Sequence, residues 1–318
     1  MLFWGILALI IIVGGTQSHL FIDHISPYQF QLLTEFSHLA DVAYCVPSPG
    51  ISEPFNCTSA CSRFNGIHLI TEFATDHANQ SCTGYIAVDD GSFSNQKKII
   101  VAFRGTNTLK DILVDSDFLQ SDLDLYGSHH GCKGCGVHAG FHDSYKQLEP
   151  IIVNAVVRLM EMYDDTPVLV VGHSLGGAMA LLAGISLSFN DAILKRGVLI
   201  VTFGQPCIGN QAFVDWLDLR FRPLSYNGSP FTSPDPSLWR VTHRNDPVCQ
   251  LPPSLDYKQS SNELYISSDG LPDSSEQIWI CLGQNDPRCN FGHHVPLAFT
   301  GVKQHVQYIS PIGFCPYL

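Results

Sequence analysis

A short apolar run at residues 168–171 is followed, within four positions, by an alanine-rich segment with helical character at residues 175–189. A run without polar side chains predicts a central strand that is buried on both faces of a sheet. The turn between strand and helix is Gly172-His173-Ser174-Leu175-Gly176-Gly177, which contains the pattern Gly-x-Ser-x-Gly. Such a turn holds the serine in a strained backbone with its hydroxyl at the carboxyl end of the strand. The segment therefore predicts a nucleophilic serine, Ser174, at the edge of a parallel sheet.

Strand-like and helix-like segments alternate on both sides of this turn. Strands that alternate with helices form a mostly parallel sheet with helices on both faces, so the predicted fold class is α/β. No long Ser/Pro/Gly-rich linker divides the chain, and we expect a single domain over residues 19–318. The expected helices are residues 27–44, 144–163, 175–189 and 212–220, and the expected strands are residues 85–88, 99–103, 168–171, 198–203, 239–243, 263–266 and 278–281.

The composition excludes several classes of protein. Hydrophobic residues make up 45% of the 318 residues and charged residues only 14%, which is incompatible with a disordered chain. The net charge of −12 disfavours nucleic acid as a partner, because an acidic surface repels phosphates. Since no uninterrupted apolar stretch reaches the length of a membrane span, a polytopic membrane protein is excluded as well.

The first residues resemble a secretion signal. Residues 2–13 are apolar and are followed by small and polar residues, which predicts a signal peptide over residues 1–18. No Lys or Arg precedes the apolar run, so a buried first element or an uncleaved anchor is the alternative interpretation. We expect a secreted, monomeric protein without a transmembrane anchor in the mature chain.

The cysteines agree with export. There are 11 of them, and an oxidising compartment favours disulfides between cysteines that lie close in sequence. The histidines around Cys132 and Cys135 also resemble a zinc knuckle, but secretion favours the disulfide, and we expect no metal. The predicted short-range pairs are Cys57 with Cys61, Cys132 with Cys135, and Cys281 with Cys289, and the candidate glycosylation acceptors are Asn56, Asn79 and Asn227.

A serine nucleophile needs a base, and the base needs an acid. In folds with this turn the chain order is Ser, acid, His. Asp246 follows the predicted strand 239–243 through a short turn and is the expected acid. The alternative is that Asn245-Asp246-Pro247 only forms a turn and has no catalytic role. Four histidines follow the serine, and position alone does not separate His294 from His305 as the base.

Four segments together resemble the fungal class 3 lipase family, which includes triacylglycerol lipases, mono- and diacylglycerol lipases and feruloyl esterases. The resemblance extends over residues 30–315 and implies an α/β-hydrolase fold with a short lid helix. The segments are Gly172-His173-Ser174-Leu175-Gly176-Gly177, Phe103-Arg104-Gly105-Thr106, Arg240-Val241-Thr242-His243-Arg244-Asn245-Asp246 and Leu251-Pro252-Pro253.

The resemblance also implies roles for individual residues. It makes His305 the base, in a loop ahead of a final cysteine, Cys315, that pairs with Cys45 at the end of the first helix. The oxyanion hole would consist of the backbone N–H of Leu175, the residue after the nucleophile, and of Thr106, which could equally cap a helix. The lid would follow Thr106 with an apolar face made by Leu109, Ile112 and Leu113, although Ile112 stands where many members have Trp and an ordinary surface helix is the alternative.

The expected function is hydrolysis of acylglycerol esters by Ser174, Asp246 and His305, without a cofactor or metal, on an ester substrate at a lipid interface. A feruloyl esterase or a phospholipase of the same fold is the first alternative. A non-catalytic lipid- or glycan-binding protein is the more remote one.

Overall fold

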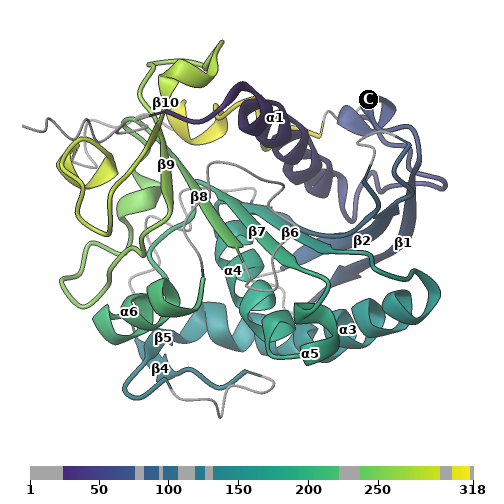
Figure 1. Ribbon diagram of the computed structural model, residues 1–318, viewed down its shortest axis with the longest axis horizontal. Coiled ribbons are helices and arrows are strands. Elements are labelled where there is room, and N and C mark those ends of the chain that lie inside the picture. Colours follow the sequence, from purple (N-terminus) through teal and green to yellow (C-terminus); the bar gives the residue numbers. More distant parts are fainter. Residues whose placement is uncertain are drawn as a thin grey trace, which may run out of the picture.

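The computed structural model describes residues 24–75, 82–92, 96–106, 119–125, 132–221, 237–293 and 303–315. Within these residues, eight strands form one sheet in the order β1-β2-β3-β6-β7-β8-β9-β10 (Figure 1). The pairs from β3 to β9 are parallel and the pairs at the two ends are antiparallel, which confirms the predicted mostly parallel sheet. The strands are β1 (Ile67–Ala74), β2 (Thr83–Asp89), β3 (Lys98–Phe103), β6 (Val168–His173), β7 (Val198–Phe203), β8 (Ser237–His243), β9 (Glu263–Ile266) and β10 (Ile278–Ile280).

Helices cover both faces of this sheet, as Figure 1 shows. The helix α1 (Pro27–Val42) packs on one face, against side chains such as Ile100. The helices α3 (Ala139–Met162) and α4 (Leu175–Ser188) pack on the other, against side chains such as Val101. Successive strand residues point to opposite faces, so a strand between two helical layers must be apolar throughout. The shorter helices are α5 (Asp191–Leu194) and α6 (Gln211–Arg220).

Several elements differ from the sequence expectations. The strand β1 was not among the expected strands, because it lies at the sheet edge and buries few of its side chains. A small separate hairpin of β4 (Gln120–Asp122) and β5 (Gly136–His138) was not expected either. The helix α3 begins at Ala139 rather than at residue 144, with Nδ1 of the His138 side chain accepting from the backbone N–H of Phe141. None of the described helices is long and apolar enough to cross a bilayer.

The C-terminal segment returns across the molecule to α1. The disulfide Cys45–Cys315 joins the segment to the short 3₁₀ helix that follows α1. The carboxylate of Asp41 accepts hydrogen bonds from two backbone N–H groups of the segment, those of Gly313 and Phe314, at 2.9 and 3.1 Å. These links hold residues 303–315 against the body of the protein, at the end of the sheet where β6 enters α4.

Candidate active site

The turn between β6 and α4 has the strained backbone expected for a nucleophile. Ser174 has φ 58° and ψ −129°, a left-handed conformation that residues with a side chain rarely adopt. A side chain at Gly172 would overlap the carbonyl of Gly176, so this position requires glycine. The backbone N–H of Ser174 donates to the carbonyl of Phe203 at the end of β7 (2.8 Å), which ties the turn to the sheet.

The structure brings the predicted acid and the predicted base together. Asp246 lies three residues beyond the end of β8 at His243, and His305 lies in the 3₁₀ helix η7 (Gln304–Val306). His305 Nδ1 is 2.8 Å from Oδ2 and 3.0 Å from Oδ1 of Asp246, and both side chains are fully buried. A carboxylate only accepts, so Nδ1 carries the proton and Nε2 of a neutral ring is free to accept one.

The residue before Ser174 packs against this pair. The ring of His173, the residue before the serine, is 4.6 Å from the ring of His305 between centroids. Ser174 Oγ and His305 Nε2 are both buried, and neither has a hydrogen-bond partner among the described residues. Buried polar atoms are usually paired, so these two unpaired atoms call for an explanation, and roles in catalysis would supply one.

Further donors surround the carboxylate of Asp246. Tyr308 Oη donates to Oδ2, the backbone N–H of Val248 donates to Oδ1 at 2.9 Å, and Cys249 Sγ lies 3.6 Å from Oδ2. Burial raises the pKa of Asp246, but the charge of His305 and the hydrogen bonds from His305, Tyr308 and Val248 outweigh it. The net pKa of Asp246 therefore lies below its ordinary value, which keeps the group ionised.

The oxyanion candidates lie at two different chain segments. Thr106 follows the end of β3, and its Oγ1 is a third buried atom without a partner among the described residues. Leu175 is the first residue of α4, where backbone N–H groups lack partners within the helix. The predicted lid residues Leu109, Ile112 and Leu113, and the alternative base His294, lie outside the described residues.

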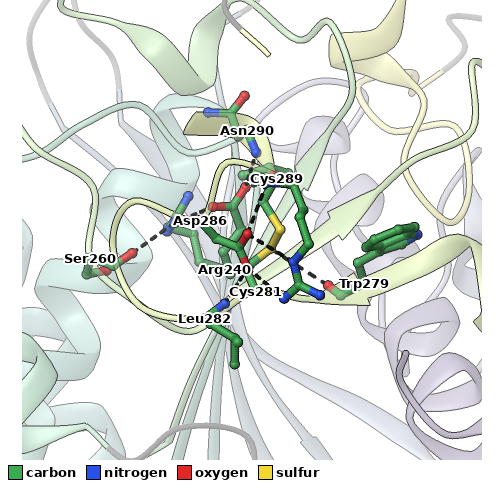
Figure 2. The surroundings of a disulfide bond; sticks show 11 residues. Arg240, Ser260, Trp279, Cys281, Leu282, Asp286, Cys289 and Asn290 are labelled. Atoms are coloured by element: carbon green, nitrogen blue, oxygen red, sulfur yellow. Dashed lines mark hydrogen bonds and ion pairs between the residues drawn. A yellow bond between two sulfur atoms is a disulfide. The ribbon is translucent and has the colours of Figure 1, made fainter. Parts of the chain in front are cut away.

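The predicted cysteine pairs are joined in the structure. Figure 2 shows Cys281–Cys289, which closes a loop whose Asp286 accepts from the backbone N–H of Leu282 at 2.8 Å. The structure also contains Cys57–Cys61, Cys132–Cys135 and the pair Cys45–Cys315 that the family resemblance implied. The remaining thiols, Cys82, Cys207 and Cys249, are buried and unpaired. Among the candidate glycosylation sites Asn56 is exposed, whereas Asn79 and Asn227 lie outside the described residues.

Sequence reasoning missed several residues around the site. Tyr308 was not among the predicted site residues, and its hydrogen bond to Asp246 was not expected. The ring nitrogens of His243 contact the backbone carbonyls of Gln304 and Ser268, at 3.1 and 2.8 Å, and so hold the loop that contains His305. Arg240 is fully buried and pairs with Glu263 at 3.1 Å, and Figure 2 shows it among the surroundings of the disulfide Cys281–Cys289. Arg240 belongs to one of the four segments that resemble the lipase family, but nothing local in the sequence identifies Glu263 as its partner.

The fold and this arrangement of side chains define a serine hydrolase of the α/β type. The sequence profile of the lipases of class 3, described as "Lipase (class 3)", matches residues 100–255. The secreted mono- and diacylglycerol lipase 2 of Gibberella zeae is 34% identical over 285 residues, which cover 83% of this chain and 68% of that protein. Lipase A of Sodiomyces alcalophilus is 32% identical, with the same two shares, 83% and 68%.

Solved structures agree with the sequence relatives. The crystal structure of the Lip2 lipase from Yarrowia lipolytica superposes with a TM-score of 0.80 at 33% identity, over 93% of this chain and 98% of that one. Lipase II from Rhizopus niveus superposes with a TM-score of 0.73 at 26% identity, over 92% and 99% of the two chains. The chain belongs to the class 3 lipase family, and its fold is that of the α/β-hydrolases.

Proposed function

We propose that the protein is a secreted lipase that hydrolyses the ester bonds of acylglycerols through Ser174, His305 and Asp246. The observation that carries the proposal is the pattern of partners around His305. Its Nδ1 is held by Asp246, while its Nε2 and the hydroxyl of Ser174 are buried without partners in the described chain. The relatives named as acylglycerol lipases support the substrate class.

The geometry suggests the following reaction. Ser174 Oγ attacks the ester carbonyl carbon as its proton passes to His305 Nε2, and Asp246 stabilises the imidazolium that forms. The negative oxygen of the tetrahedral intermediate accepts hydrogen bonds from the backbone N–H of Leu175 and from Thr106. The intermediate collapses to an acyl-enzyme, and the departing alcohol takes the proton from His305. Water then repeats the same steps and releases the fatty acid.

Secretion and action at a lipid surface belong to the same proposal. The disulfides of the structure and the relative from Gibberella zeae, which is named as secreted, support export. An apolar lid, proposed at Leu109, Ile112 and Leu113, would transfer its apolar face from the protein to the lipid. Burial is worth about 25 cal/mol per Å2 of apolar surface, so a few hundred Å2 would be enough to shift such an equilibrium.

A substrate panel tests the proposal. Release of acid would be titrated with emulsified tri-, di- and monooleoylglycerol, phosphatidylcholine and methyl ferulate, for the native protein and for Ser174→Ala. We expect the highest rates with a glyceride and none with the variant. Preference for methyl ferulate or phospholipid would refute the acylglycerol assignment. Failure of a fluorophosphonate to label Ser174 in the native protein would refute the serine mechanism itself and favour a binding protein.

A further inference from the structure

The side chain before the nucleophile is buried and is not used by the proposed triad. The imidazole of His173 is 1% exposed. Its Nε2 is 2.7 Å from the backbone carbonyl oxygen of His305, and its Nδ1 is 2.6 Å from Tyr44 Oη. The ring therefore lies between the loop of the proposed base and the end of the first helical segment.

The direction of these two hydrogen bonds follows from the chemistry of the groups. A backbone carbonyl only accepts, so Nε2 of His173 must carry the proton and donate it. In a neutral ring Nδ1 is then an acceptor, and the hydroxyl of Tyr44 must be the donor to it. Burial, followed by repulsion from His305, lowers the pKa of His173 to about 3, and the ring is thus neutral at ordinary pH.

The Tyr44 hydroxyl also lies directly against Gly105. Gly105 directly precedes Thr106, the proposed oxyanion donor, and a side chain at Gly105 would collide with the Tyr44 hydroxyl and lie 2.9 Å from Ser174 Cβ. This contact and the two hydrogen bonds of His173 together connect the strand end that carries the proposed oxyanion donor with the loop that carries the proposed base.

We propose that Tyr44 and His173 are positioning residues, which align the oxyanion segment at Gly105 with the backbone of His305 on either side of Ser174. The inference rests on the proposed function and adds to it two residues that touch neither substrate nor the reacting atoms. Buried hydrogen bonds in series strengthen one another, and a small displacement of a catalytic group can cost about 100-fold in rate. The expected effect is therefore on the chemical step and not on substrate binding.

Three variants separate the contribution of the Tyr44–His173 hydrogen bond from that of the hydrogen bond between His173 and the His305 carbonyl. Tyr44→Phe removes one oxygen atom, and we expect kcat to fall about tenfold with KM nearly unchanged. In His173→Gln the amide nitrogen can take the place of Nε2 and donate to the His305 carbonyl. In His173→Asn the amide can replace only Nδ1, so the contact with the base loop is lost. We expect His173→Gln to retain about tenfold more activity than His173→Asn on a soluble p-nitrophenyl ester.

Tyr85→Phe is the matched control. Tyr85 is fully buried against the same apolar cluster as Tyr44, and its hydroxyl donates to the carbonyl of Leu39 at 2.9 Å, away from the site. This control should lose stability like Tyr44→Phe while kcat stays at the native value.

Three outcomes would overturn the inference: native kcat in Tyr44→Phe, an equal fall in kcat in Tyr44→Phe and Tyr85→Phe, or equal activities of His173→Gln and His173→Asn. If the native protein hydrolyses no ester, the proposed function fails instead, and this result is recognised before any variant is compared.

Discussion

Removing the disulfide Cys45–Cys315 should destabilise the protein far more than removing a short-range disulfide. The two cysteines are 270 positions apart, whereas Cys57 and Cys61 are 4 apart. A cross-link restricts the unfolded chain more strongly when it closes a longer loop. The loop-entropy relation predicts a contribution of about 5.5 kcal/mol for the long loop and about 2 kcal/mol for the short one. The difference, about 3.5 kcal/mol, is a large part of the total stability of a typical domain.

Equilibrium unfolding in urea of two double variants measures this difference. Cys45→Ala/Cys315→Ala removes the long-range link, and Cys57→Ala/Cys61→Ala is its matched control. The long-range variant should still hydrolyse ester while folded, because Asp41 continues to hold the tail through its two backbone hydrogen bonds. An equal loss of stability in the two variants, or a larger loss in the control, would refute the reasoning.

Two further predictions concern buried groups. Tyr308→Phe removes a hydrogen bond to the charged carboxylate of Asp246, and the free energy of unfolding should fall by about 1.5–3 kcal/mol in chemical denaturation, with native stability as the contrary result. The second concerns His173, whose pKa burial lowers to about 3 in the folded protein from about 6.5 in the unfolded chain. As the pH falls below about 6.5 the unfolded state binds a proton that the folded state does not, so stability should decrease between pH 6.5 and 3. Urea midpoints measured over this range should fall less steeply in His173→Gln, and identical slopes would contradict the assignment.

Local patterns were sufficient wherever the defining interactions are close in sequence. The strand, the two glycines and the helix that present Ser174 all lie within one segment, and the strained φ of 58° was implied by the motif. The buried strands β6 and β7 could be predicted because burial on two faces requires an apolar residue at every position. The edge strand β1 was not predicted, because a strand that buries few of its side chains has no continuous apolar run.

The choice of base needed more than local patterns. His294 and His305 were equivalent by chain order, and only the resemblance to a family favoured the second. The structure places His305 against Asp246, 59 positions away in sequence, because the tail is drawn back along α1. No periodicity or motif encodes such a contact.

The amino-acid sequence alone was enough to determine the α/β class and to point to the proposed nucleophile and to the strand end that bears the proposed acid, because short-range periodicity and turn chemistry specify them. Tertiary packing decided which donor meets which acceptor. Tyr44 reaches His173 across 129 positions, and His173 reaches the backbone of His305 across 132. Many side chains in the sequence carry donors and acceptors that could form such bonds. Only the packing of two helical layers against one sheet brings these particular groups within hydrogen-bonding distance.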